Sequence, residues 1–382
     1  MKMKYILPIN VMIMVMILPT GCKKDEFNWG ENVGNITYSG NVVFLGDKEL
    51  ASLKEVTANR IVFTDKAGEI EKITEMSILV VGVSQKTPYG LLRKVNSIQT
   101  SGTEIVITTT DALLADAIKE GTIQFQKKLL EKDFRLKSKT DGVLVKGPDK
   151  SFDGLAVTLD NFEIFTNGTK IARLNGAIGI SPEIDITIII KSNKLIGINL
   201  VTTLNKIDEV TVSSNGGFSG SKEIIAAEFI HSPVIIDSLV FVPEVTISCG
   251  FDGTISGEVT SGVRQDRVIT SKMSYLNSKW DEEPLTQTVS FDFTKPQITE
   301  NSDLEIFSGP EINILLFGVP VQDIKATGFY SLEAEKTSSP FWKLYIGSDG
   351  YNKVKANILG FNDDHSLNMT IKASEISNAN SK

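Results

Sequence analysis

The sequence predicts a mainly β protein, in which a small β module with one helix precedes a large antiparallel β domain, either a sandwich or a barrel-like sheet. Three observations lead to this prediction. Apolar and polar residues alternate with a period of two in many runs, most strictly in EIDITI at 183–188. Turn sequences rich in asparagine and glycine separate the runs. Helical periodicity is confined to one short segment.

The small module is expected to cover residues 41–138. Its β-type runs lie at 41–45, 60–64, 77–83, 91–99 and 104–109. A polar turn of hairpin length separates the last two runs. A helix is predicted over residues 110–120, because Leu113, Leu114, Ala117 and Ile118 form an apolar stripe and Gly121 can end it.

A polar, charged segment at 137–142 is the expected domain boundary. The large domain is expected to cover residues 142–375, followed by a polar tail at 376–382. Its predicted strands lie at 155–165, 169–180, 183–188, 195–204, 207–213, 234–242, 245–259, 265–275, 287–293, 304–307, 312–316, 324–334, 341–347 and 353–359. Many long alternating runs joined by tight turns are typical of antiparallel sheets.

Residues 1–21 have the features of a bacterial signal peptide. Two lysines precede an apolar run at 5–18, which is shorter than the roughly 20 residues of a membrane-spanning helix. The run ends in LPTGC at 18–22, which resembles a lipobox. That resemblance implies cleavage after Gly21, a diacylglycerol on the Cys22 sulfur and acylation, for example by palmitate, of the new amine. The mature chain would then begin with a tether at 22–40 and stay attached to a membrane through Cys22.

The segment KKDE at 23–26 is similar to the charged signal that sends lipoproteins of the Bacteroidota to the outer face of the outer membrane, although it also reads as a solvated linker. We therefore predict an outer-membrane lipoprotein and leave open whether it faces the cell exterior. Loss of Lys2 and Lys4 with the signal takes the net charge from −8 to −10. An acidic chain of this kind argues against nucleic-acid partners.

Few residues point to chemistry. Cys249 lies in an alternating run and is expected to be a packed strand residue, with no internal disulfide partner. His231 and His365 lack the spacing of metal ligands or catalytic pairs, so no catalytic residue, metal or cofactor is predicted. One alternative is a calcium site that would combine Asp252 with the Asp363–Asp364 pair.

Two stretches, at 78–118 and 308–347, resemble an uncharacterised family of secreted bacterial proteins. The first contains ILVVGV and PYGLLRKV, and the second contains SGPEINILLFGV and PFWKLYIG. The resemblance implies a β-rich protein of the cell surface and carries over no catalytic residues.

The predicted function is a membrane-anchored binding or structural module that contacts glycan or envelope protein. Two alternatives stay open. Long amphipathic strands could wall a cavity that carries an apolar ligand. A polysaccharide hydrolase would need two carboxylates facing each other across a cleft. The absence of catalytic motifs favours a protein that is not an enzyme.

Overall fold

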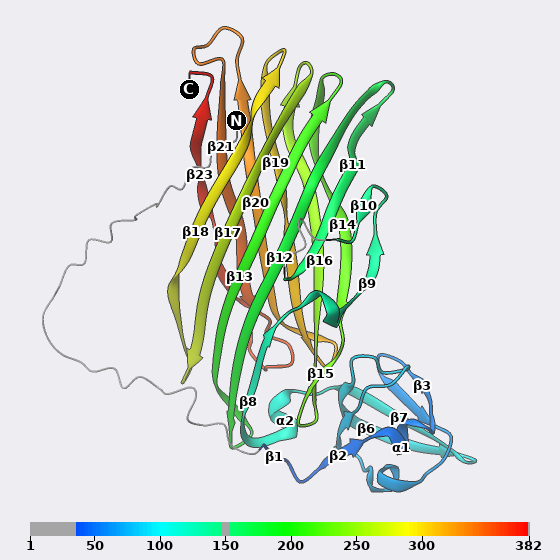
Figure 1. Ribbon diagram of the computed structural model, residues 1–382. Coiled ribbons are helices and arrows are strands. Elements are labelled where there is room, and N and C mark those ends of the chain that lie inside the picture. The colour runs from blue at the N-terminus through cyan, green and yellow to red at the C-terminus, as the bar shows by residue number, and fades with distance from the viewer. Residues whose placement is uncertain (1–35, 147–152, 381–382) are drawn as a thin grey trace, which may run out of the picture.

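The computed structural model describes residues 36–146 and 153–380, and 70% of it is strand. The predicted β class is confirmed. Two large antiparallel sheets face each other as a sandwich, and a smaller sheet forms a second unit at one end (Figure 1). No helix among the described residues is long and apolar enough to cross a membrane.

The first large sheet, called the β13 sheet, has eight strands in the order β1-β8-β12-β13-β17-β18, with β11 also paired to β12 and β10 to β11. Its strands are β1 (Thr37–Tyr38), β8 (Ile118–Lys128), β10 (Val143–Leu144), β11 (Leu155–Asn167), β12 (Lys170–Lys191), β13 (Lys194–Ser214), β17 (Val259–Leu276) and β18 (Lys279–Ile298).

The second large sheet, called the β19 sheet, has nine strands in the order β22-β21-β20-β19-β16-β14-β9, with β15 paired to β16 and β23 to β21. Its strands are β9 (Phe134–Lys139), β14 (Phe218–His231), β15 (Val234–Ile236), β16 (Leu239–Ile255), β19 (Ser302–Leu316), β20 (Val319–Ala334), β21 (Trp342–Val354), β22 (His365–Asn368) and β23 (Ile371–Asn378). Because β23 extends to Asn378, part of the predicted polar tail is strand.

The small unit is a six-stranded sheet in the order β2-β5-β6-β7-β4-β3, in which only β2 and β5 are parallel neighbours. Its elements are β2 (Val42–Leu45), α1 (Asp47–Leu50), β3 (Leu53–Val56), β4 (Arg60–Phe63), the 3-10 helix η1 (Gly68–Lys72), β5 (Ile78–Val81), β6 (Leu91–Ser101) and β7 (Glu104–Asp111). It has a hydrophobic core of its own, built around Phe63 and Ile107. The predicted hairpin is β6 and β7.

The boundary between the units lies earlier than the sequence predicted. β8 pairs with β12 and β9 pairs with β14, so both strands belong to the sandwich and not to a module at 41–138. The expected boundary segment at 137–142 is bound to the β19 sheet, because the Thr140 N–H donates to the Ala226 carbonyl at 3.0 Å. The small unit therefore ends with β7 at Asp111.

The predicted helix at 110–120 is wrong in length. Only α2 (Leu114–Ala117) is helical, because β7 continues to Asp111 and β8 begins at Ile118. Three residues of the apolar stripe, Leu114, Ala117 and Ile118, are nevertheless at most 1% exposed, whereas Leu113 is 40% exposed. The apolar pattern indicated side chains that face the core, but it did not predict the conformation of the backbone that carries them. The other short helix is η2 (Glu131–Asp133), between β8 and β9.

β12 runs unbroken through Pro182, although proline has no N–H for a ladder. β8 ends opposite Glu183, and β11 begins opposite Ile180, so one side of β12 has a gap at this point. The Pro182 carbonyl accepts a hydrogen bond from the Leu129 N–H at 2.9 Å on that side. A residue in an antiparallel strand directs its N–H and C=O to the same side, so the missing donor faces the gap.

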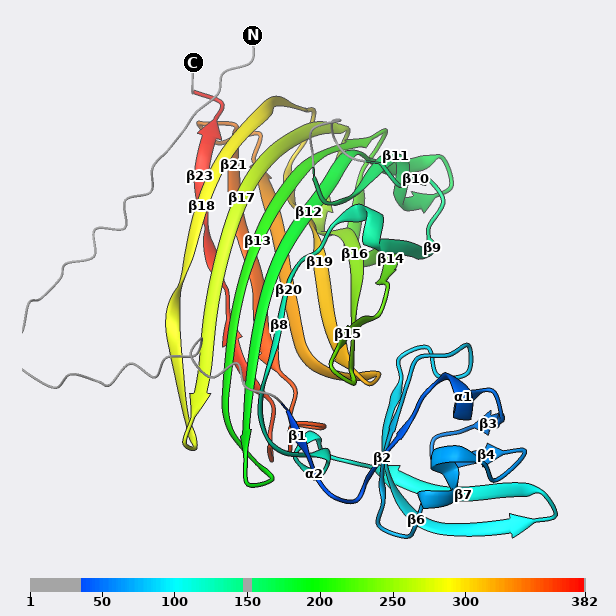
Figure 2. The ribbon, with the colours of Figure 1, turned by 60° about the horizontal axis from the view of Figure 1, so that its bottom comes forward.

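The space between the two large sheets is filled by one contiguous cluster of buried side chains. Alternate residues of β13 point into it, including Ile198, Leu200 and Leu204. Both views show the two sheets curving over each other along their length (Figures 1 and 2). This packing identifies the predicted large domain as a sandwich.

Candidate functional site: a pocket between the two units

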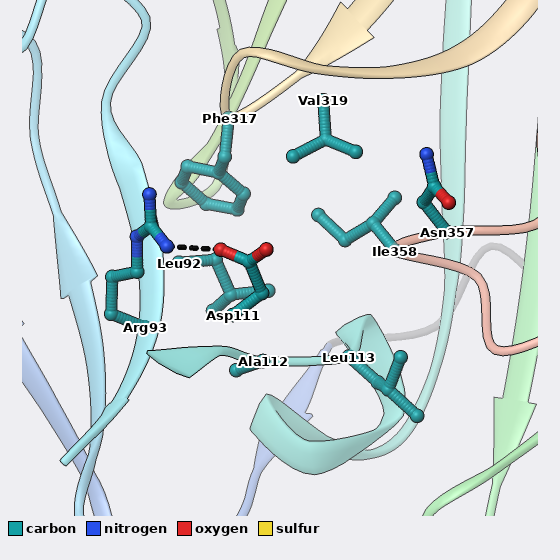
Figure 3. Close-up of a pocket in the computed structure, with 9 residues that line it drawn as sticks. All are labelled: Leu92, Arg93, Asp111, Ala112, Leu113, Phe317, Val319, Asn357 and Ile358. Atoms are coloured by element: carbon teal, nitrogen blue, oxygen red, sulfur yellow. Dashed lines mark hydrogen bonds and ion pairs between the residues drawn. The ribbon is translucent and has the colours of Figure 1, made fainter. Parts of the chain in front are cut away.

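A pocket of about 370 Å³ opens where the small unit meets the end of the sandwich (Figure 3). Four parts of the chain line it: β6, the end of β7 with the link to α2, the turn between β19 and β20, and the chain after β21. The lining residues are Leu92, Arg93, Asp111, Ala112, Leu113, Phe317, Val319, Asn357 and Ile358.

The turn between β19 and β20 supplies an aromatic wall. Phe317 has a φ of +52°, in the left-handed region that costs a bulky residue on the order of 1–2 kcal/mol. Packing compensates for this cost, because Phe317 is buried and its N–H donates to the Val240 carbonyl at 2.9 Å. Gly318 follows with a φ of +78° and brings the turn against Tyr89. Residues held in such conformations cluster at functional sites.

Arg93 and Asp111 form the polar wall. They lie directly opposite each other in β6 and β7, and the Arg93 Nη1 forms an ion pair with Asp111 Oδ1 (Figure 3). The Asp111 side chain is 82% exposed, so the pair contributes at most about 1 kcal/mol to stability. Its effect is to orient the guanidinium, whose other N–H groups can donate to a ligand.

Two hydrogen bonds hold the surroundings of the pocket, one between the small unit and the sandwich and one between α2 and the chain after β21. The Tyr89 hydroxyl donates to Glu244 Oε1 at 2.9 Å, and burial together with Glu244 raises the pKa of Tyr89 to about 12. The Leu114 N–H donates to the Ile358 carbonyl at 2.8 Å. In the turn before β6, Gly90 has a φ of +64°, and a Cβ there would lie 2.9 Å from Val240. These contacts hold the turn before β6 and the start of α2 in place beside the pocket.

The chemistry of the lining suits binding. Its volume is at the lower end of the range for small-molecule pockets, about 300–1,000 Å³. Six apolar side chains can cover a small apolar group, while Arg93 and Asn357 can bond to a polar one. The lining residues include one carboxylate and no histidine, cysteine, lysine or hydroxyl side chain, so they lack a nucleophile paired with a base.

The structure places Cys249 in β16, fully buried, as the sequence predicted. Burial raises the pKa of its thiol to about 12, with a smaller effect from Glu223. A thiol in this environment stays protonated near neutral pH and is a poor nucleophile. Cys249 is therefore a core residue.

The two histidines lie far apart in the β19 sheet, one on β14 next to the edge strand β9 and one on the edge strand β22. His231 ends β14, is buried, and has its Nε2 3.6 Å from Asp133 Oδ2. His365 is the first residue of β22. Its ring stacks on Trp280 at 4.0 Å and its Nε2 lies 2.7 Å from Glu282 Oε1. Each histidine joins neighbouring elements, and the two do not form a common site.

The proposed calcium ligands are not brought together. Asp252 lies on β16 opposite Glu305, whereas the Asp364 carboxylate accepts the Ala356 N–H at 2.9 Å beyond the end of β21. Three strands of the β19 sheet separate β16 from β22. Within the described ranges, no group of three or more histidine, cysteine, aspartate or glutamate residues could hold a metal ion.

Cys22, the predicted lipid attachment site, lies outside the described residues, as do the signal peptide and most of the predicted tether. The pocket itself was not found from the sequence. Its residues come from segments that are up to 266 positions apart, from Leu92 to Ile358, and each segment looks like an ordinary strand end or turn. The one local signal was Phe317-Gly318, an aromatic residue at a turn.

The fold and the pocket define a two-unit β protein with a preformed ligand-sized cavity at the joint. The sequence matches no protein-family model, and neither the curated proteins nor the solved structures contain a significant match.

Proposed function

We propose that the protein is a lipoprotein of the outer membrane that binds an envelope component through the pocket between its two units. The anchor rests on the lipobox that ends at Cys22. Several acyl chains hold a protein at a membrane far more firmly than one, at about 0.8 kcal/mol for each buried methylene. The binding role rests on the pocket.

The observation that carries the binding proposal is that the joint is built around a cavity. Tyr89–Glu244 joins the small unit to the sandwich, and Leu114–Ile358 holds α2 against the chain after β21, yet the lining residues leave a space of about 370 Å³. Rigid walls reduce the entropy that is lost when a ligand binds. The expected ligand presents a small apolar group next to a hydrogen-bond acceptor, as a substituted sugar or a short peptide does.

The pocket lies at the end of the molecule where the predicted tether at 22–40 joins the folded units. β1 and the small unit share this end (Figure 1). Residues 22–36 form a chain that spans at most about 50 Å when fully extended. The pocket would therefore stay near the membrane surface, and the ligand would be a component found there.

The alternative of a carrier with a β-walled cavity has less support. The space between the two large sheets is occupied by the contiguous core, which leaves side chains where a lipid would have to lie. A polysaccharide hydrolase has no described pair of carboxylates in the pocket, because Asp111 is the one acid that lines it. No observation on the small unit or on the sandwich favours a further candidate function.

The proposal can be tested with the full chain carrying Cys22→Ser, so that no lipid interferes. Its binding to an array of envelope glycans, peptides and extracted membrane components is compared with that of Val319→Trp, which fills the pocket. Val268→Trp is the matched control, because Val268 is an exposed strand valine on the outer face of β17.

We expect the chain with the unmodified pocket and the Val268→Trp control to bind the same array component. The Val319→Trp variant should no longer bind that component. Circular dichroism and thermal unfolding show whether all three chains are folded. Binding that survives in Val319→Trp would place the ligand site elsewhere, and absence of any binding by a folded chain would count against the binding module.

A further inference from the structure

A buried ionic cluster interrupts the apolar core of the sandwich. Lys206 and Asp208 point inward from β13, and Arg267 points inward from β17; their exposed fractions are 1%, 3% and 2%. Buried charges are costly unless they are paired and hydrogen-bonded. This cluster holds two cations and one carboxylate, so it has an excess of positive charge.

The atoms of Lys206, Asp208 and Ser308 are arranged around one contact. Lys206 Nζ lies 2.5 Å from Asp208 Oδ2, but Oδ2 does not have the geometry of a hydrogen-bond acceptor there. The Lys206 amine donates to the Ser308 carbonyl at 2.8 Å. The Ser308 hydroxyl donates to Asp208 Oδ1 at 2.9 Å. One residue of β19 thus holds both the amine and the carboxyl group.

The surroundings favour the uncharged amine. Lys206 is directly opposite Arg267 in the paired strands, and like charges at such positions repel. Burial, and to a smaller extent Arg267, lowers the pKa of Lys206, while Asp208 opposes this shift. Arg267 itself is held by Gln265 and by the Gly347 carbonyl at 2.7 Å, so it is not drawn into the Lys206–Asp208 contact.

The contact is closed to bulk water. Gly328 of β20 lies against it, and a Cβ at that position would be 2.8 Å from Asp208 Oδ2 and 3.0 Å from Lys206 Nζ. The glycine therefore lets β20 lie directly against the pair, where a Cβ would press on both side-chain ends. A dry site also favours a reaction that releases water over its reversal by hydrolysis.

From this geometry we propose that Lys206 and Asp208 are a self-modification site, at which Lys206 Nζ forms an amide bond with Asp208 Cγ in the folded protein. The two residues are two positions apart in one strand, so their side chains leave the same face. The longer lysine side chain can reach over to the aspartate without any change in the strand.

The reaction is a condensation that needs no oxidant or other co-reactant. The ammonium proton passes across the ion pair to Asp208 Oδ2, which leaves a neutral amine and a carboxylic acid. Nζ attacks Cγ, and the charge that develops on Oδ1 is stabilised by the Ser308 hydroxyl, as a donor in an oxyanion hole does. A second Nζ proton moves to Oδ2, the Cγ–Oδ2 bond breaks, and one water molecule leaves.

A tryptic map of the denatured full chain tests this proposal. Trypsin cleaves after Lys194, Lys206 and Lys222, but it does not cleave after a lysine whose amine is in an amide bond. The amide therefore gives one peptide covering residues 195–222 that is lighter by one water than its sequence. Without the amide, the same region gives two peptides, 195–206 and 207–222, at their full masses.

Two outcomes would overturn the proposal. One is two peptides at their full masses. The other is cleavage after Lys206 together with a 207–222 peptide that is lighter by one water, which would indicate a cyclised aspartate. Ser308→Ala keeps the backbone carbonyl but removes the hydroxyl donor. In a folded Ser308→Ala chain, checked by circular dichroism, we expect the cross-linked peptide to fall at least tenfold relative to the two free peptides. Ser248→Ala, on the neighbouring strand β16, is the control and should leave the yield unchanged.

Discussion

Cys249 and Gly250 are neighbours in β16 whose surroundings differ. A Cβ on Gly250 would lie 2.0 Å from the Lys222 carbonyl oxygen and 2.7 Å from the Phe307 ring, so alanine cannot fit there without moving two strands. Cys249→Ala removes one buried sulfur and should cost about 1 kcal/mol of unfolding free energy. Gly250→Ala should cost more, about 1–3 kcal/mol or above. Urea unfolding measures both, with Gly40→Ala as a control whose Cβ meets nothing within 4 Å.

His231 is expected to make stability depend on pH. Burial lowers its pKa in the folded protein below the ordinary value of about 6.5, while Ser232 and Asp133 partly oppose the shift. As the pH falls through this value, the unfolded chain takes up a proton before the folded chain does. Stability contributed by neutral His231 is therefore full above about pH 6.5 and declines below it, by at most about 1.4 kcal/mol per pH unit. Chemical unfolding between pH 7.5 and 5.5 should show a smaller decline for His231→Gln, and equal slopes would contradict this assignment.

At the scale of strands and helices, alternation in the sequence predicted the elements better than their ends. The β6–β7 hairpin and the inward faces of β12 and β13 follow from period-two patterns. The length of β12 could not be predicted, because Pro182 is tolerated only where β8 and β11 leave a gap beside β12. The sequences of β8 and β11 do not show where this gap lies. The length of α2 was overestimated for a similar reason, since Ile118 is taken up by the pairing of β8 with β1.

The gap beside Pro182 gives a test at this scale. Pro182→Ala adds an N–H that faces the gap, so the unfolding free energy should change by less than about 1 kcal/mol. Thr187→Pro removes an N–H from a position of β12 that is paired on both sides, with Gln124 and Asn199, and should cost about 3 kcal/mol or more. Thermal unfolding of the two variants compares them directly. Similar losses would mean that the ladder is not interrupted at Pro182.

At the scale of the whole molecule, the sequence predicted two β units but misplaced the boundary, because β8 and β9 carry the same alternation as any other strand. The pocket could not be predicted from the sequence, since it exists only where Arg93, Phe317 and Ile358 meet.

The lipid anchor, in contrast to the pocket, was predicted from residues 1–26 alone, and it stays a prediction. Changing Cys22 to Ser should move the protein from the detergent phase to the aqueous phase in phase partitioning, and retention in the detergent phase would place the membrane attachment elsewhere.

The central claim is that the cavity between the units binds a ligand. Its most direct test is the dissociation constant of the strongest array component for three folded, lipid-free chains. We predict that Val319→Trp weakens binding at least tenfold, about 1.4 kcal/mol, while Val268→Trp leaves it within a factor of two of the parent chain. Equal dissociation constants for Val319→Trp and the parent would contradict the claim, because a ligand in this pocket cannot share its space with an indole ring.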